Sequence, residues 1–169
     1  MSAEAATLES TELGRRLRAV PAPRPVLDRD REARLTGRQR EVLDQLGTLF
    51  DDGFADLTMA DIAANVGCSL RTLYDLAPSR DELVLTVIDR NLRRIGRRAI
   101  SAVQPDLDPL AVIRSYLMAA NLAVAATTPA FARDQAATPA THRLVTAHSD
   151  YLVSITKTLL DLAVEHGNI

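Results

Sequence analysis

A chain of 169 residues is long enough for one domain of ordinary size, or for a small head joined to a helical body. Aromatic residues contribute only 4% and tryptophan is absent, so the core must use Leu, Val, Ile and Ala, which favours an all-α fold. The net charge of −2 and the single cysteine exclude a strongly basic protein, an internal disulfide and a zinc site of several cysteines.

The charged residues are concentrated in the front of the chain. Residues 1–98 hold 16 Arg and 16 acidic residues, whereas residues 99–169 hold 4 basic and 6 acidic residues. Arginine suits bidentate contacts to phosphate or guanine, but its dominance over lysine equally fits a GC-rich genome. No apolar run reaches the roughly 20 residues that span a bilayer, and the N-terminus lacks a signal-peptide core, so we expect a cytoplasmic protein without membrane contact.

Residues 1–35 are expected to form a flexible, Arg-rich arm. Residues 12–20 could form two helical turns, and the segment PAPRP at 21–25 then stops any helix. Nine Arg residues lie between Arg15 and Arg40. Such an arm could follow a phosphate backbone or enter a minor groove. The alternative is a mobile tail whose charges remain in water.

The first helix of a compact head is expected from Thr36–Gly37 to about Asp52, because apolar residues recur there at helical spacing. These residues are Val42, Leu43, Leu46, Leu49 and Phe50. Gly53 is a natural left-handed stop for this helix, and Phe54 packs the turn that follows.

The stretch from Thr58 to Tyr74 predicts two short helices joined by a tight turn. Thr58 and Asp61 have the spacing of a capping box, and Gly67 lies where the chain must turn. Ser69 caps the second helix, which is expected from Leu70 to about Asp75.

On this second helix the side chains divide into two faces. Leu73 points inward, whereas Arg71, Thr72 and Tyr74 point outward. A helix, a short turn with glycine and a second helix with polar side chains form the helix-turn-helix pattern. Small all-helical domains also use such pairs simply to close a core.

The rest of the chain predicts a long connecting helix and a helical body. Ser79 caps the connecting helix, with Glu82 at the capping-box position, and this helix is expected to run to about Val103. Pro105 and Pro109 mark a linker. Two further helices are expected at about 110–126 and 140–165, with a short helix or turn at 129–135 between them. The first of these helices is apolar nearly all round, which predicts burial on most sides.

The last helix carries a seam with a 4-3-4-3-4 spacing, which predicts packing against another helix of the same subunit or of a partner. The residues of this seam are Leu144, His148, Tyr151, Ile155, Thr158 and Leu162.

Residues from about 39 to 83 resemble the N-terminal DNA-binding domain of the TetR family of transcriptional repressors, with order, spacing and residue type agreeing over some 45 residues. The matching residues are Leu49-Phe50-Asp51-Asp52-Gly53-Phe54, Thr58, Ile62-Ala63, Val66-Gly67, Ser69, Thr72-Leu73-Tyr74 and Ser79-Arg80-Asp81-Glu82-Leu83. The chain is therefore expected to comprise the arm (1–35), a helix-turn-helix DNA-binding domain (36–78), and a connecting helix with a ligand-binding and dimerisation domain (79–169).

The resemblance implies a set of DNA contacts: Thr58, Ser69, Leu70, Arg71, Thr72, Tyr74 and Arg80. Thr58 would bind phosphate through its hydroxyl and the amides of the helix end. Arg71 and Thr72 would face base edges, with Arg71 suited to guanine. Tyr74 and Arg80 would hold the phosphate backbone.

Each of these roles has a structural alternative. Thr58 and Ser69 are also ordinary helix caps, and Arg71 can simply be exposed on a short helix. Tyr74 can pack beneath the turn. Leu70 offers only an apolar contact, for instance to a thymine methyl group.

The chain departs from the family pattern after Tyr74. The family often has x-His-Phe there, whereas this chain has Asp75, Leu76 and Ala77, so a phosphate donor and a large core side chain are missing. The affinity of one head is therefore expected to be modest, with the Arg-rich arm compensating. Only 64 residues follow Pro105, so either the body is reduced or a dimer uses the last helix present.

We expect a dimeric repressor that binds a pseudo-palindromic operator in double-stranded DNA and is released by a small apolar or amphipathic effector. The candidate effector contacts are the polar groups on otherwise apolar helices: Tyr116, Asn121, His148 and Tyr151. For each of them, a satisfied core or surface role is the favoured alternative.

The rival hypothesis is a helical protein-interaction module that kept the helix-turn-helix head but lost strong DNA binding. A neutral or acidic recognition face would favour it. An enzyme is not expected, because His142, His148 and His166 lack metal-ligand spacing, Cys68 has no obvious base and no Gly-rich phosphate loop is present. We expect no metal and no cofactor.

Overall fold

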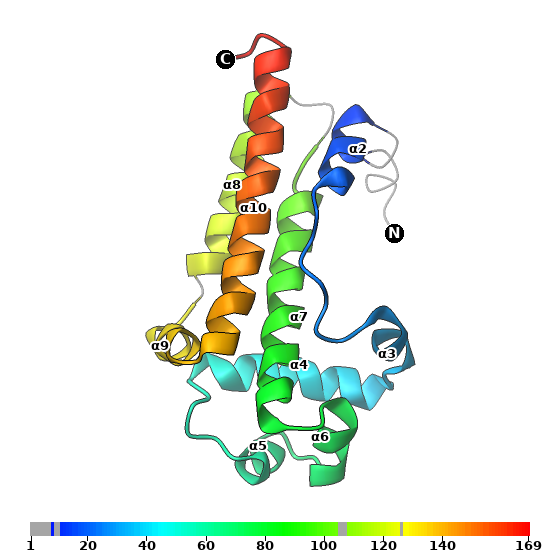
Figure 1. Cartoon of the computed structure of the whole chain (residues 1–169), viewed down its shortest axis with the longest axis vertical. Helices are drawn as coiled ribbons and strands as arrows, with labels where there is room; N and C mark the ends of the chain where they lie inside the picture. Colours follow the sequence, from blue (N-terminus) through cyan, green and yellow to red (C-terminus); the bar gives the residue numbers. More distant parts are fainter. Residues whose placement is uncertain (1–7, 9–10, 105–107, 126) are drawn as a thin grey trace. The chain divides into compact units, whose positions relative to one another are not determined.

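The computed structural model describes residues 8, 11–104, 108–125 and 127–169. In these residues the chain is all-helical and forms no strand, which confirms the predicted fold class (Figure 1). Residues 1–7 and 9–10 of the expected arm, and Pro105 of the expected linker, lie outside the described residues. None of the helices in the described part is both long and apolar enough to cross a membrane.

The helices of the front part are α2 (Glu12–Ala19), α3 (Arg29–Arg34), α4 (Gly37–Asp51), α5 (Met59–Asn65) and α6 (Leu70–Leu76). They are followed by α7 (Arg80–Ser101), α8 (Pro109–Ala125), α9 (Pro129–Ala137) and α10 (Pro139–Glu165). Except for α3, each of these helices lies where the sequence predicts one, and the predicted bounds agree closely with the observed ones.

The chain forms two compact units. The head unit comprises Arg24–Leu92 and Thr127–Val145, and the body unit comprises Met1–Pro23, Arg93–Ala126 and Thr146–Ile169. These boundaries differ from the expected domains, because the head unit also contains α3, the start of α7, α9 and the start of α10. Residues 127–145 are distant along the chain, so local sequence pattern does not reveal that they belong to the head.

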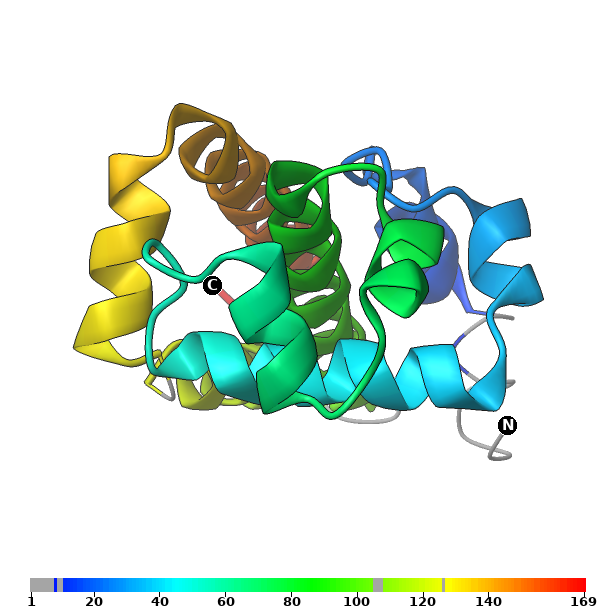
Figure 2. The same cartoon turned by 90° about the horizontal axis from the view of Figure 1, so that it is seen from below.

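The centre of the head unit is α4. Its apolar residues Val42, Leu46 and Phe50 are completely buried, together with Ile62 of α5 and Leu73 of α6. Figure 2 shows α4 crossing the first turns of α7, with α5 and α6 on the side that faces the viewer. The burial of these side chains against one another is the main force that holds α5 and α6, because helices this short are not stable alone.

For residues 11–35, the structure corrects the expectation of a flexible arm. Thr11 caps α2, and Leu17 on its inner face is buried in the body unit. Asp28 caps α3, while Leu27 and Leu35 on either side of α3 are buried in the head unit. The capping residues and these apolar side chains together supply enough interactions to order a segment that composition alone describes as a charged tail.

The body unit is built from α2, the end of α7, α8 and most of α10. Its core contains Val112, Ile113 and Tyr116 of α8 with Ile155 and Leu159 of α10. The prediction that α8 is buried on most sides is wrong for residues 109–122, whose side chains the structure describes, because this one face of the helix is covered and the others are not. Its other faces expose Leu110, Leu117, Met118 and Leu122.

Candidate nucleic-acid interface

The predicted helix pair is present as α5 and α6, joined by a turn at Val66–Ser69. Gly67 has a φ of 60°, a left-handed conformation that glycine adopts without steric cost. The Cys68 N–H donates to the Ala63 carbonyl over 3.0 Å, which ties the turn to the end of α5. The pair therefore has the local geometry that the sequence predicts.

The outer face of α6 carries side chains that are exposed to solvent and not packed in the core. Leu73 and Leu76 hold the helix to the core, whereas Leu70 is 45% exposed and Tyr74 is 53% exposed. Arg71 is also exposed, and neither its guanidinium nor the Tyr74 hydroxyl bonds to any residue that the structure describes. The alternative in which Tyr74 packs beneath the turn is therefore wrong.

The hydroxyl of Thr58 is occupied within the capping box of α5. It accepts the Asp61 N–H over 3.2 Å and donates to an Asp61 carboxylate oxygen over 2.5 Å. The Thr58 hydroxyl and N–H, as hydrogen-bond donors to the Asp61 carboxylate, hold the pKa of Asp61 below its ordinary value. The N-terminus of α5 thus already has a negative charge, which opposes the predicted phosphate contact.

Ser69 and Thr72 form a smaller cap at the start of α6. The Ser69 hydroxyl accepts the Thr72 N–H over 3.1 Å, and the two hydroxyl oxygens lie 2.9 Å apart. Ser69 is exposed and Thr72 is partly exposed. Each hydroxyl oxygen has a second lone pair, so these residues keep the capacity for a further contact.

The predicted role of Arg80 as a phosphate contact conflicts with its hydrogen bonds. Its Nε donates to the Leu57 carbonyl over 2.5 Å, and one terminal nitrogen donates to the carbonyls of Phe54 and Ala55. The other terminal nitrogen pairs with Asp81. The guanidinium therefore holds the loop between α4 and α5, and this structural role explains why an arginine is needed there.

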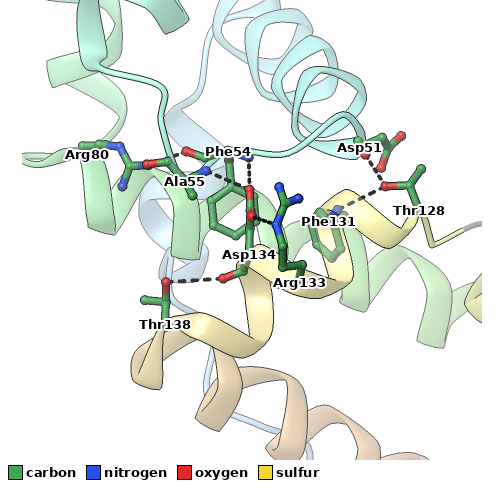
Figure 3. Close-up of polar contacts among 9 residues, drawn as sticks. All are labelled: Asp51, Phe54, Ala55, Arg80, Thr128, Phe131, Arg133, Asp134 and Thr138. Atoms are coloured by element: carbon green, nitrogen blue, oxygen red, sulfur yellow. Dashed lines mark hydrogen bonds and ion pairs between the residues drawn. The ribbon is translucent and has the colours of Figure 1, made fainter.

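The same loop is held from its other side by Asp134 of α9, a residue that sequence reasoning missed (Figure 3). Asp134 is only 4% exposed, and its Oδ2 accepts the N–H groups of Phe54 over 2.7 Å and Ala55 over 2.9 Å. Gly53, with a φ of 104°, allows the close approach, since a Cβ atom there would lie 3.0 Å from Oδ2. We call Asp134 and Arg80 the loop clamp.

The carboxyl group of Asp134 is stabilised in its charged form. Burial alone would raise its pKa, but the N–H donors of Ala55 and Phe54 and the Arg133 guanidinium outweigh burial, so the pKa falls below the ordinary value. Nearby, the Thr128 hydroxyl donates to the Asp51 carbonyl, and the Phe131 ring packs 5.7 Å from the Phe54 ring, measured between centroids. These contacts join α9 to the end of α4 and the following loop.

The structure does not gather the four predicted effector contacts into one site. Tyr116 is buried, its hydroxyl donates to the Leu152 carbonyl over 3.4 Å, and burial raises its pKa to about 12. Asn121 is exposed on α8. His148 is buried in α10, whereas Tyr151 is partly buried there and burial raises its pKa.

Two hollows in the body unit are lined by other residues. One has a volume of about 730 Å³ and opens widely to solvent between α2 and α10. The other, of about 340 Å³, is more enclosed and has apolar walls made by Leu13, Val112, Leu159 and Leu162. The four candidates line neither hollow. Sequence reasoning could not have found the lining residues, because a sequence shows polar residues on apolar helices but does not show where cavities form between helices.

Comparison of the chain with protein-family models, curated proteins and solved structures gives no match. In the described residues, no group of three or more His, Cys, Asp or Glu side chains lies close enough together to hold a metal ion. The candidate site is thus the outer face of α6 with the residues around it.

Proposed function

We propose that the protein is a TetR-like DNA-binding transcriptional regulator. One observation carries the proposal: Arg71 and Tyr74 are exposed without a bonding partner in the described chain, on a helix that buried leucines hold firmly. Arginine matches the O6 and N7 acceptors of guanine, and a tyrosine hydroxyl binds phosphate. A side chain already held on a rigid helix loses less entropy on binding than one on a mobile loop.

In this proposal α6 enters the major groove and the contacts are fewer than the resemblance implies. Arg71 and Thr72 read base edges, Leu70 contacts a thymine methyl group, and Tyr74 binds the backbone. Thr58 and Arg80 are removed from the contact set, since both are used inside the head. Asp75 is exposed on α6 and repels phosphate, which lowers the affinity of one head.

We propose further that the working unit is a homodimer, since two heads are needed to read a pseudo-palindrome. Three apolar residues of α10 are exposed at a spacing of seven and four residues, Val153, Leu160 and Val164. A stripe of this spacing is typical of a helix that packs along another helix. We propose that a second copy of the chain packs on this stripe, because a pseudo-palindrome is bound by two heads.

The proposed effector is a small apolar or amphipathic molecule. The smaller hollow, of about 340 Å³, is lined mainly by apolar side chains together with Thr11, Glu12 and His166, and it supports this part of the proposal. An effector would weaken DNA binding only if it binds more tightly to a conformation of the dimer in which the spacing of the two heads does not fit the operator. A regulator of this kind would act in the cytoplasm.

The proposal is tested by selecting duplexes from a random library and titrating the best one by fluorescence anisotropy. We expect binding that weakens with salt, with Arg71→Ala reducing the sequence preference and Tyr74→Phe reducing affinity on all duplexes alike. Arg97→Ala, at an exposed arginine of the body unit, is the matched control and should behave like the wild type. A wild-type protein that selects no duplex at low salt would refute the proposal.

A helical protein-interaction module is the second candidate. It is favoured by the exposed apolar side chains of α8, among them Met118 and Leu122, because contiguous exposed apolar surface marks interaction sites. It is also favoured by the internal use of Thr58 and Arg80. The duplex selection separates the two candidates, since an interaction module would enrich no sequence.

A further inference from the structure

The region beside α6 contains a second group of arginines that the proposed contacts do not include. Residues 29–40 hold five Arg against two acids, Asp30 and Glu32, and the flanking residues Asp28 and Glu41 are also acidic. Glu32 is neutralised by an ion pair with Arg90 of α7. Four of the arginines, which we call the α3–α4 rim, are exposed: Arg29, Arg34, Arg38 and Arg40.

The rim lies next to α6 because hydrogen bonds attach its helices to both ends of α6. At the C-terminal end, Arg31 of α3 donates to the Leu76 carbonyl over 3.2 Å. At the N-terminal end, Arg38 of α4 donates to the Gly67 carbonyl over 3.1 Å, in the turn before α6. In Figure 2, α3 and α6 lie next to each other near the N-terminal end of α4.

The rim is also held in place, unlike the arginines of a mobile arm. The Val26 N–H donates to the Asp89 carboxylate of α7 over 3.0 Å, and Leu27 and Leu35 are buried in the core of the head. The guanidinium groups of Arg29 and Arg34 bond to no residue that the structure describes, so their donors are available. Arg38 forms an ion pair with Glu41 over 3.1 Å and donates to the Gly67 carbonyl, and Arg40 donates to the Ala33 carbonyl, so both use part of their donors within the head.

We infer that the α3–α4 rim is a second DNA-binding element, which contacts the phosphate backbone flanking the bases read by α6. The inference rests on the proposed function and adds a binding element to it. Guanidinium groups match phosphate oxygens, and an anchored backbone leaves only their side chains to be ordered when they bind. Phosphate contacts carry no sequence information, so the rim would supply affinity to a head whose Asp75 weakens it.

The test is the salt dependence of DNA binding by the full chain. Each phosphate contact that is lost lowers the slope of log Kobs against log salt concentration by about 0.9. Arg29→Gln/Arg34→Gln is therefore expected to lower this slope by about 1 to 2, with the preference for the selected duplex over a scrambled one unchanged. Arg29→Lys/Arg34→Lys keeps both charges and should restore most of the slope, which also separates lost contacts from lost folding.

The matched control is Arg97→Gln/Arg98→Gln, which removes the same charge from exposed positions of the body unit. If the rim variant has the same slope as this control and the wild type, while Arg71→Ala still loses sequence preference, the inference fails and the proposed function stands. If the wild-type protein binds no duplex at all, both fail. A rim variant that changes sequence preference without changing the slope would also overturn the inference.

Discussion

Arg80 and Asp134 hold the two sides of the same loop, and their charges are complementary to its backbone groups. Arg80 donates to the carbonyls of Phe54, Ala55 and Leu57, whereas Asp134 accepts the N–H groups of Phe54 and Ala55. A charged group that makes several hydrogen bonds to backbone fixes a loop more firmly than neutral contacts do. The path of the chain from α4 into α5 therefore depends on two side chains from other helices.

Arg80→Ala and Arg80→Lys are both expected to destabilise the protein, by about 2 to 3 kcal/mol for the alanine variant, because loop carbonyls lose their donors. Lysine keeps the charge but cannot reach three carbonyls with a planar fork. Urea unfolding measures the change. A phosphate-binding role predicts the opposite pattern, with Arg80→Lys as stable as the wild type and DNA binding alone affected.

The clamp also predicts a pH dependence. The pKa of Asp134 is lowered from its ordinary 3.8 in the folded protein, so the stability it contributes is fully present above about pH 4 and is lost as the pH falls through the lowered pKa. The difference in unfolding free energy between the wild type and Asp134→Asn should thus be larger at pH 7 than at pH 3. Equal differences at both pH values would contradict this account of the carboxylate.

Neither member of the clamp could be given its role from sequence. Asp134 is 80 residues from Phe54 along the chain, and Arg80 is 26 residues from it. Helical spacing and capping patterns predict contacts only between residues a few positions apart, so they cannot predict contacts across 26 or 80 residues. The family resemblance predicted that Arg80 contacts DNA, because it aligns this residue with a position in the family pattern. It does not show which groups the side chain contacts in this protein, and these are backbone carbonyls of the loop.

At the scale of single helices, the sequence predicts most of the fold, because helix ends are set by local chemistry. Thr58, Ser69 and Asp61 make the caps that their spacing predicts, and Pro109 begins α8. The missing prediction is α3, a short helix without an apolar stripe. It is held by Leu27 and Leu35 outside its own bounds, and by the ion pair between Glu32 and Arg90.

The turn between α5 and α6 gives a test at this scale. Gly67→Ala places a Cβ atom on a residue with a φ of 60°, which should destabilise the protein by about 1 kcal/mol. Gly47→Ala is the matched control in α4, where a Cβ atom would meet nothing within 4 Å, and it should stabilise the helix by about 0.5 to 1 kcal/mol. Thermal or urea unfolding of both variants checks the opposite signs; the same sign for both would contradict the turn geometry.

For the whole molecule, the division into a head unit and a body unit was predicted in outline but not in its boundaries. The core of each unit joins segments that are far apart along the chain, such as Leu46 with Phe131 in the head and Leu17 with Ile155 in the body. Apolar periodicity identifies the buried face of each helix but does not identify its partner. This also explains why α8 was expected to be covered on faces that are exposed.

The proposed homodimer predicts a change in mass when the α10 stripe is altered. Leu160→Glu introduces charge into the stripe and should convert a dimer to a monomer, because interface cores exclude unpaired charge. Leu117→Glu on α8, a leucine of the same exposure class, is the control and should leave the mass unchanged. Light scattering during size exclusion gives the answer, and a wild-type monomer at micromolar concentration would contradict the dimer.

The central claim is that Arg71 on α6 reads a guanine. It is tested most directly by measuring the affinity of the wild type and of Arg71→Ala for the selected duplex and for copies in which each guanine is replaced in turn by 7-deazaguanine, which lacks the N7 acceptor. We expect one replacement to weaken the wild type about tenfold or more and to leave Arg71→Ala unaffected. If every replacement weakens the two proteins equally, Arg71 does not contact guanine N7 and the account is wrong.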